Sequence, residues 1–299
     1  DRTAERAAEW AAEWAAEWAA EWAAEWAAEW AAEWAAESGR RIRRVCRVTA
    51  SIDVREVAGW LAAADRVTEL TGAGISTGSG IPDFRGPQGV WTLNPEAQRM
   101  FSLDEYVRDQ ELRQKAWINR RDHPAWTARP NPGHLALVDL ERSGRLRALL
   151  TQNIDGLHQR AGSDPDLVLE LHGTLFGVEC LQCSARTTME EALERVAAGE
   201  PDPPCAICGG VQKAATVSFG QALRADVLDA AVRASADCDV FLAVGTSLQV
   251  QPAAGLCEVA VSRGARLVIV NADPTPYDRL AAALVRGEIS DVLPALLAR

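Results

Sequence analysis

Four of the seven cysteines of this chain fall into two Cys-x-x-Cys pairs. Cys180 and Cys183 form the first pair, and Cys205 and Cys208 form the second after a spacer of 21 residues. Each pair can form a metal-binding knuckle, and two knuckles complete the tetrahedral shell of four thiolates that zinc prefers. Because the protein supplies all four ligands, no position is left for a reactive water. The pattern therefore predicts one structural zinc ion.

The remaining cysteines, Cys46, Cys238 and Cys257, stand alone and are expected to be small buried apolar residues. The chain has no uninterrupted apolar run of about 18 residues and no visible signal peptide, so we expect a cytoplasmic protein without a membrane span. In such a reducing compartment, two disulfides or a redox switch are the less favoured alternatives for the paired cysteines.

A glycine-rich turn, residues 72–77, follows a strand predicted over residues 67–71 and is expected to lead into a helix. Glycines at such a turn let backbone N–H groups approach a pyrophosphate. Thr77 replaces the third glycine of the usual fingerprint, so the turn alone fits an ordinary strand-to-helix connection equally well. Beyond this turn, Phe84 places an aromatic ring near where the nicotinamide ring of a bound dinucleotide could lie. Arg85 offers a forked cation for its phosphate groups.

Two further groups of polar residues follow predicted strands, where α/β folds place their ligand crevice. The segment 151–158 ends one strand, although its Asn153 and Asp155 taken alone would suit a turn. His172 ends the next strand and can take a proton near neutral pH. An isolated histidine is more often structural, but its position at a strand end favours catalysis here.

The elements that must position these residues alternate between strand and helix. Apolar runs that are hydrophobic on both faces, such as residues 240–244, are typical of strands buried in a parallel sheet. The pattern predicts a doubly wound, Rossmann-like α/β domain with a parallel sheet. The predicted strands are 67–71, 146–151, 167–171, 215–219, 240–244 and 266–271, and the predicted helices are 53–64, 133–142, 226–236 and 253–263.

The N-terminal segment differs from the rest of the chain. Residues 7–34 repeat Ala-Ala-Glu-Trp seven times, which favours a helix, but each Trp lies roughly 40° further round than the last. We interpret residues 1–40 as a low-complexity helical repeat and linker rather than an oligomerisation or partner-binding arm. Residues 41–299 then form the main domain, with residues 176–214 as an inserted zinc-binding module.

The charge is also uneven. The formal net charge is −11, of which −8 lies in residues 1–37, so −3 remains for the rest of the chain. A nearly neutral body without a basic face is not expected to bind nucleic acid.

Taken together, three segments resemble the signature motifs of the sirtuin family of NAD-dependent protein-lysine deacylases, in its bacterial type. They are Gly-Ala-Gly-Ile-Ser followed two residues later by Ser-Gly-Ile-Pro-Asp-Phe-Arg (72–85), Thr-Gln-Asn-Ile-Asp-Gly-Leu-His (151–158) and Leu-His-Gly (171–173). The resemblance covers about residues 52–298 and leaves out the repeat.

The resemblance implies roles for individual residues. His172 would act as the general base together with Asn153 as a catalytic residue, and Val217 and Phe219 would pair with the substrate peptide as an added strand. Gln221 departs from the Glu that many sirtuins carry. The implied NAD-binding residues are Gly72, Ala73, Gly74, Ser76, Thr77, Phe84, Arg85, Gln152, Asn153, Ile154, Asp155, Gly245, Thr246, Ser247, Asn271 and Val285.

The implied activity is the NAD-dependent removal of acyl groups, with acetyl favoured, from lysine side chains of a protein or peptide. The products would be nicotinamide and O-acyl-ADP-ribose. Two alternatives use the same NAD site: a mono-ADP-ribosyltransferase and a non-catalytic NAD or ADP-ribose sensor. A sensor has no need of a general base, so His172 and Asn153 argue against the last. The substrate protein stays open.

Overall fold

The structure is a computed structural model that describes residues 54–298. The repeat and the predicted domain boundary at residue 40 lie outside the described residues and stay predictions. No helix within the described range is long and apolar enough to cross a lipid bilayer.

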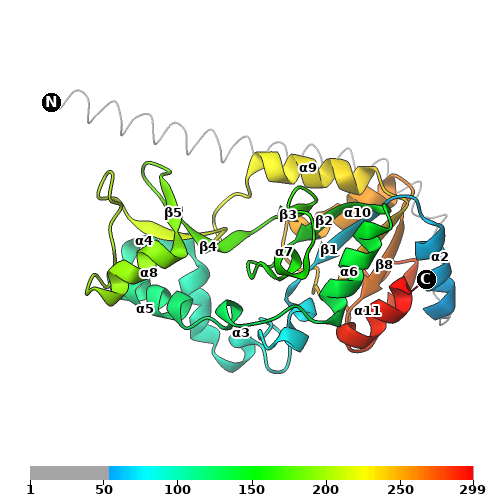
Figure 1. The fold of residues 1–299 in the computed structure, drawn as a ribbon, viewed down its shortest axis with the longest axis horizontal. Helices are drawn as coiled ribbons and strands as arrows, with labels where there is room; N and C mark the ends of the chain where they lie inside the picture. Colours follow the sequence, from blue (N-terminus) through cyan, green and yellow to red (C-terminus); the bar gives the residue numbers. More distant parts are fainter. Residues whose placement is uncertain (1–53, 299) are drawn as a thin grey trace. The chain divides into compact units, whose positions relative to one another are not determined.

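A six-stranded parallel sheet forms the centre of the larger domain (Figure 1). Its strand order is β3-β2-β1-β7-β8-β9, which corresponds to the order 3-2-1-4-5-6 of dinucleotide-binding folds. All five strand pairs are parallel. The strands are β1 (Val67–Thr71), β2 (Leu146–Thr151), β3 (Val168–Glu170), β7 (Val240–Val244), β8 (Arg266–Val270) and β9 (Ala283–Val285).

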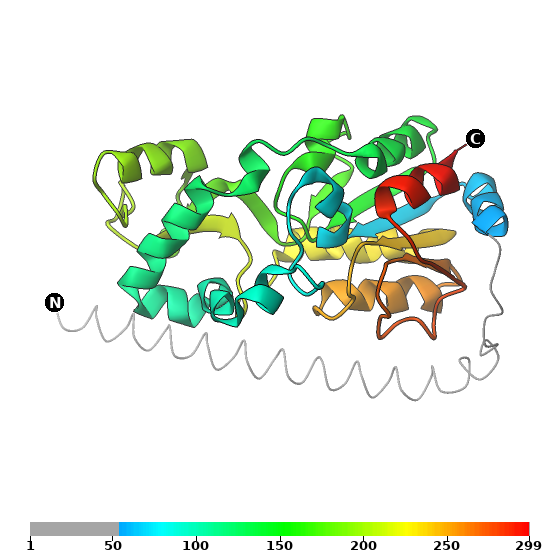
Figure 2. The same ribbon diagram turned by 90° about the horizontal axis from the view of Figure 1, so that it is seen from below.

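Helices cover both faces of this sheet (Figure 2), which confirms the predicted doubly wound fold. One face packs against α2 (Val54–Ala63), α6 (Pro132–Arg142) and α11 (Ile289–Leu297). The other face packs against α9 (Ala225–Ala236) and α10 (Leu256–Ser262). We call the sheet and these five helices the sheet domain.

A second, smaller region surrounds an antiparallel sheet with the strand order β5-β4-β6. Its strands are β4 (Gly173–Cys180), β5 (Arg186–Thr188) and β6 (Gln212–Thr216), and its helices are α3 (Val90–Leu93), α4 (Leu103–Arg108), α5 (Gln110–Arg121) and α8 (Met189–Ala197). In Figure 1 α4, α5 and α8 lie together around β4 and β5. We call residues 90–121 and 173–216 the small lobe; the narrower module bounds 176–214 stay a prediction.

Local sequence explains where the main helices begin. The side chain of Asn131 accepts a hydrogen bond from Gly133 N (2.9 Å) and caps α6, whose first residue is Pro132. In the small lobe, Thr188 and Glu191 form a reciprocal capping box at the start of α8.

Two sequence-based expectations were wrong in detail. No α-helix follows the glycine-rich turn: two 3₁₀ turns, Ala73–Ile75 and Thr77–Ser79, end at Gly80, whose φ of 83° stops helical winding. The strand predicted over 215–219 is displaced, since β6 ends at Thr216 and Phe219 leaves the sheet to form a parallel bridge with Ser102.

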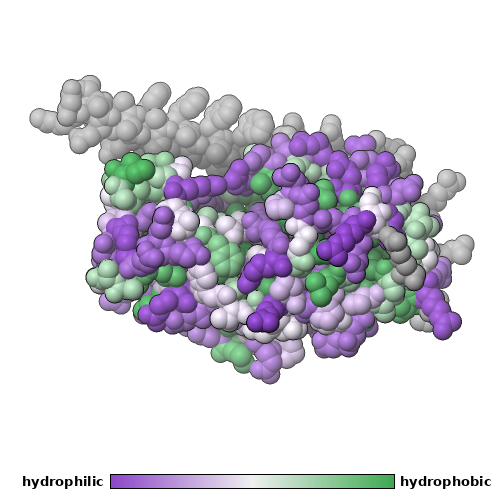
Figure 3. Space-filling view, viewed as in Figure 1, coloured by the Kyte–Doolittle hydropathy of each residue, from purple (hydrophilic) through white to green (hydrophobic). Residues whose placement is uncertain are grey.

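On the face shown in Figure 3, hydrophilic and apolar residues are interspersed without one continuous apolar surface. The two isolated cysteines within the described range, Cys238 and Cys257, are buried as expected, while Cys46 lies outside that range.

Candidate active site at the ends of the parallel strands

The glycine-rich turn after β1 packs directly on the loop after β7. Gly72 N donates to Val244 O (3.0 Å), and Gly74 N donates to Gly245 O (2.8 Å). A Cβ atom on Gly72 would lie 2.8 Å from Gly245 O, and one on Gly74 would lie 2.8 Å from Gly245 Cα. Both glycines are thus required by loop packing, in addition to any approach of a phosphate.

The loop after β2 is bonded to the same turn. Asn153 Nδ2 donates to Gly72 O (3.1 Å), and the Ser76 hydroxyl donates to Asp155 Oδ2 (2.7 Å). The second carboxylate oxygen of Asp155 accepts from Leu157 N (2.9 Å). Burial raises the pKa of Asp155, while the two hydrogen bonds oppose that rise. Asn153, Asp155 and Ser76 are all buried, so these bonds fix the side chains in one arrangement.

The third loop, after β7, joins through Gln152. Gln152 Nε2 donates to Thr246 Oγ1 (2.9 Å), which also accepts from Leu248 N (3.2 Å). Gly245 has φ = 61°, a conformation that favours glycine. The loops after β1, β2 and β7 therefore meet at one edge of the sheet, as the strand-end motifs predicted.

His172 lies beside these loops, directly before β4. Its Nδ1 is 3.1 Å from Gln152 O, so Nδ1–H donates to that carbonyl and Nε2 carries the free lone pair. Burial lowers the pKa of His172, and the carbonyl of Gln152 partly opposes this. The imidazole is therefore neutral at physiological pH and able to take a proton through Nε2.

The segment after the glycine-rich turn forms an aromatic cluster. The ring of Phe84 lies 4.7 Å from that of Trp91 and 5.6 Å from that of Phe101, centroid to centroid. The guanidinium carbon of Arg85 lies 4.6 Å from the Trp91 ring centroid. Burial lowers the pKa of Arg85. Stacking on Trp91 holds the cation in place and leaves its N–H edges for an anion.

The remaining predicted cofactor residues lie on the same side of the sheet. Thr77 Oγ1 donates to Gly74 O (2.9 Å), and Asn271, directly after β8, donates through Nδ2 to Asp273 O (2.8 Å). The side chain of Val285 is buried in the core, so only its main chain can meet a ligand; Val285 O already accepts from Asn271 N (3.2 Å). Ala73, Ile154 and Ser247 belong to the three loops that meet.

The predicted substrate segment is tied to both regions. Val217 N donates to His172 O (2.9 Å), and Phe219 exchanges hydrogen bonds with Phe101 O (2.7 Å) and Leu103 N (3.0 Å). Within residues 54–298, no hydrogen bond uses the carbonyl of Val217 or the main chain of Gly220. These are the groups that a peptide strand would meet.

The glycine after His172 permits this junction. Gly173 has φ = 72°, and a Cβ there would lie 2.1 Å from Ala215 O. Gly173 also pairs with Thr216 in the antiparallel sheet. The close approach of β4 and β6 beside the imidazole therefore requires glycine.

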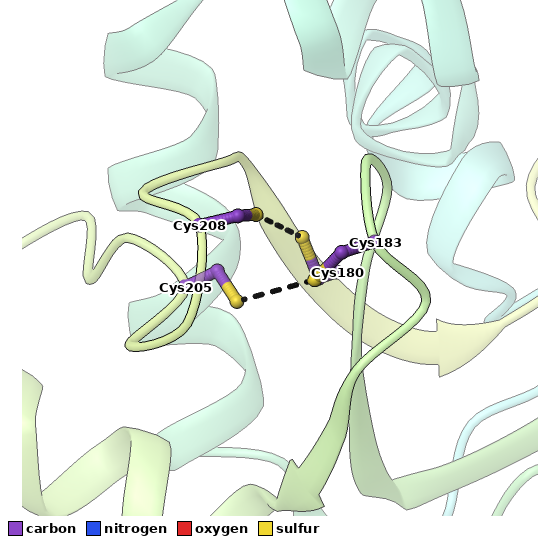
Figure 4. Close-up of side chains that lie close together, drawn as sticks. All are labelled: Cys180, Cys183, Cys205 and Cys208. Atoms are coloured by element: carbon purple, nitrogen blue, oxygen red, sulfur yellow. Dashed lines mark hydrogen bonds between the residues drawn. The ribbon is translucent and has the colours of Figure 1, made fainter.

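The four paired cysteines converge at the far end of β4 (Figure 4). Cys180 Sγ lies 3.5 Å from Cys208 Sγ, Cys183 Sγ lies 3.7 Å from Cys205 Sγ, and all four sulfurs lie within 4.8 Å of one another. A tetrahedral zinc with bonds of about 2.3 Å would set its ligands about 3.8 Å apart. The cluster therefore fits one zinc ion.

The zinc site is remote from the imidazole. Cys180 and Gly173 lie at opposite ends of β4, and seven residues of strand span roughly 20 Å. Because all four ligands are cysteines, the ion would be structural and would take no part in chemistry at His172.

Similarity to known proteins agrees with this geometry. The profile of the Sir2 family matches residues 72–252. A Streptomyces coelicolor relative named NAD-dependent protein deacetylase 2 is 55% identical over 231 residues, which cover 77% of this chain and 96% of the relative. NAD-dependent protein deacetylase 1 of Pyrobaculum aerophilum is 44% identical, over 83% of this chain and 94% of the relative. The chain belongs to the Sir2 family.

Solved structures give the same result. A Sir2 protein with a p53 peptide and NAD⁺ has a TM-score of 0.72 and 34% identity, covering 82% of this chain and 98% of the other. A Sir2 histidine-to-alanine variant with a deacetylated p53 peptide and 3′-O-acetyl-ADP-ribose has a TM-score of 0.74 at 34% identity, covering 81% and 96%.

Sequence reasoning missed some residues that shape the site. Trp91 carries the stacked Arg85 and contacts Phe84, and the only signal was its place in an aromatic-rich segment. Thr71 and Thr151 join β1 to β2 through a hydroxyl bond of 2.8 Å, and Thr151 Oγ1 also accepts from Asn153 N (3.1 Å). Threonines inside apolar strands gave no warning of this role.

Proposed function

We propose that this protein removes acyl groups, with acetyl as the main substrate, from lysine side chains in an NAD-dependent reaction. The products are free lysine, nicotinamide and O-acyl-ADP-ribose, with water as the other reactant. The main support is one contact: His172 Nδ1 lies 3.1 Å from Gln152 O and so faces the meeting point of the three strand-end loops.

NAD supplies the electrophilic C1′ of its nicotinamide ribose, from which nicotinamide leaves, and the ADP-ribose that carries the acyl group away. His172 Nε2 takes a proton from a ribose hydroxyl, because Nδ1 is held by Gln152. Asp155 is fixed by Ser76 and Leu157, and its remaining lone pairs accept the carboxamide N–H of nicotinamide.

The other predicted residues have supporting positions. Arg85 presents a charged edge to phosphate while its face rests on Trp91. Asn153 donates its amide N–H groups to Gly72 and Ser76, which leaves its Oδ1 toward the ribose. The carbonyl of Val217 accepts from the acyl-lysine amide, in line with an added peptide strand.

The test is nicotinamide release from NAD in the presence of an acetyl-lysine peptide. His172→Ala is expected to abolish steady-state nicotinamide release and formation of O-acyl-ADP-ribose, because the ribose hydroxyl that carries the acyl group away is no longer deprotonated, while zinc content and circular dichroism stay unchanged. Full activity of His172→Ala would refute the assignment. Because burial lowers the pKa of His172, wild-type activity should be lost on acidification only below pH 6.5, where the imidazole becomes protonated.

A matched control is His123→Asn. His123 accepts from Ala125 N (3.1 Å) at the start of a 3₁₀ turn, and Asn can replace it as the capping acceptor. Activity of this variant should equal wild type. Acyl-independent transfer of labelled ADP-ribose to protein would favour the mono-ADP-ribosyltransferase, and NAD binding without turnover would favour the sensor.

A cytoplasmic location is part of the proposal. It is supported by the four clustered cysteines, whose arrangement suits a zinc ion and is typical of a reducing compartment. Fractionation of the native host with an antibody to the protein tests it.

A further inference from the structure

Lys213 on β6 is a buried cation whose bonds all go to neutral oxygens. Its side chain is 4% exposed. Nζ donates to the carbonyl of Ala214 (3.1 Å), to the carbonyl of Thr216, and to Gln221 Oε1 (3.3 Å). A buried ammonium normally has a carboxylate partner, and this one has none among residues 54–298.

The positions of these acceptors are informative. Thr216 directly precedes the segment Val217–Gly220 that would meet the substrate, and Gln221 directly follows it. Gln221 Oε1 also accepts from Ser218 N (3.2 Å), and Gln221 N donates to Ser218 O (3.0 Å). One ammonium group therefore holds both ends of the segment and, through Gln221, its centre.

The surroundings of Lys213 leave its charge poorly compensated. Arg120 of α5 and Tyr106 of α4 line the same small cavity of about 20 Å³. The charge of Arg120 repels Lys213, and Glu179 of β4, which attracts it, already pairs with Arg186 (3.0 Å). Burial, assisted by Arg120, lowers the pKa of Lys213 to about 8.

We propose that Lys213 is a positioning residue that holds the segment Val217–Gly220 in its peptide-pairing conformation through Thr216 and Gln221. The inference rests on the proposed function, since that segment is assigned to acyl-lysine binding. Loss of the Lys213 proton removes the charge that favours three carbonyl acceptors at once. The segment then loses its fixed conformation, and the peptide binds more weakly while chemistry at His172 continues.

The test separates KM for an acetyl-lysine peptide from kcat at pH 7.0 and pH 9.5, with saturating NAD. Wild-type KM is expected to rise about tenfold across this range, with a smaller change in kcat. A tenfold rise corresponds to the loss of one to two charge-assisted hydrogen bonds. The acyl-lysine carries no charge and His172 titrates below this range, so neither contributes to the rise.

Three variants sharpen the test. Lys213→Met should show the raised KM already at pH 7.0 and little further change with pH. Gln221→Glu gives the ammonium a carboxylate partner, raises its pKa, and should move the rise in KM to higher pH. Lys115→Met is the matched control. Lys115 is the other lysine of the chain and is exposed on α5, so this variant should reproduce the wild-type profile.

A wild-type KM that is unchanged between pH 7.0 and pH 9.5 would overturn the inference. So would a Gln221→Glu profile identical to wild type, which stays informative if Lys213→Met does not fold. Absence of turnover by wild type at pH 7.0 refutes the proposed function instead. In that case the dissociation constant of a fluorescent acetyl-lysine peptide, measured over the same pH range, tests Lys213 independently of activity.

Discussion

The sheet domain and the small lobe meet at His172 but are stabilised in different ways. The sheet domain has an apolar cluster on each face of its parallel sheet. The small lobe has one modest core of five buried residues, Trp117, Val178, Met189, Ala192 and Ala214, and the Cys₄ cluster at its other end. Burial of apolar area can stabilise the first region alone, while the second needs its metal.

This difference has a functional side. The sheet domain supplies the loops that would hold NAD, and those loops are bonded to one another across strands. β6 of the small lobe leads directly into the segment Val217–Gly220, which would hold the peptide. If the proposed function holds, a rigid cofactor site would lie beside a peptide site whose order depends on the metal and on Lys213.

The largest expected effect comes from losing the zinc. Cys205→Ser should remove about 10 kcal/mol of metal-binding free energy from the small lobe and abolish deacylation. Hydrogen exchange is expected to lose protection over residues 173–216 while β7 and β8 stay protected. Simultaneous loss of protection in both regions would contradict the contrast between them. Metal content by mass spectrometry confirms that the ion is gone.

The next effect belongs to the sheet domain. Leu137 is fully buried between α6 and the sheet, so Leu137→Ala should reduce the free energy of unfolding by about 2–5 kcal/mol. Zinc content should not change. Leu135→Ala on the same helix is the control, because Leu135 is 49% exposed and should shift the melting temperature little. Zinc loss from Leu137→Ala would show that the two regions are not independent.

Glu69 provides an effect of opposite sign. It lies in the centre of β1, is fully buried, and neither carboxylate oxygen has a partner within residues 54–298. Burial, with Glu141 contributing, raises the pKa of Glu69 to about 8. The folded state therefore keeps a proton that the unfolded chain releases, and stability falls as pH rises from about 4.5 to about 8.

Replacing this carboxylate should stabilise the protein. Glu69→Gln is expected to gain on the order of 1–3 kcal/mol at pH 8 and nothing near pH 4.5, because Gln stays neutral. Thermal melts at both pH values measure this. Equal melting temperatures of wild type and variant at pH 8 would mean that Glu69 has a partner in solution.

The smallest effect concerns the bonds between loops. Ser76→Ala removes the hydroxyl bond to Asp155 and should cost about 1 kcal/mol of stability. The freed carboxylate should raise KM for NAD about fivefold while KM for the peptide stays constant. A rise in both constants would show that the cofactor loops and the peptide segment are coupled more tightly than their hydrogen bonds indicate.

The sequence was most informative for the central strands of the sheet domain, since β1, β2 and β7 have the bounds predicted for them. β7 is a continuous apolar run, as expected of a strand buried on both faces, whereas β1 includes Glu69 and was located by the glycine-rich turn that follows it. The cysteine spacing indicated the zinc-binding module of the small lobe, but β4, β5 and α3 were not predicted, because their short sequences carry no clear periodicity. The displacement of β6 has a different origin: Phe219 pairs with Ser102, more than a hundred residues earlier in the chain.

The site shows the same division. Motif residues such as Asp155 and His172 were identified because their types suit the chemistry, and their assigned roles stay predictions. Ser76, Gln152 and Thr246 were also named as cofactor residues, but the hydrogen bonds through which they support the site were not predicted, because those bonds join distant segments of the chain. The bonds of Lys213 are invisible in the sequence for the same reason.

Gly173 has a consequence for how this protein can vary. It stands where the sheet domain and the small lobe join, and even a single methyl group there would collide with the carbonyl of Ala215. Substitutions of Gly173 are therefore not tolerated, although glycine has no reactive side chain. A variant library of this protein would tolerate changes on the surface of the small lobe, whereas only glycine would be accepted at position 173.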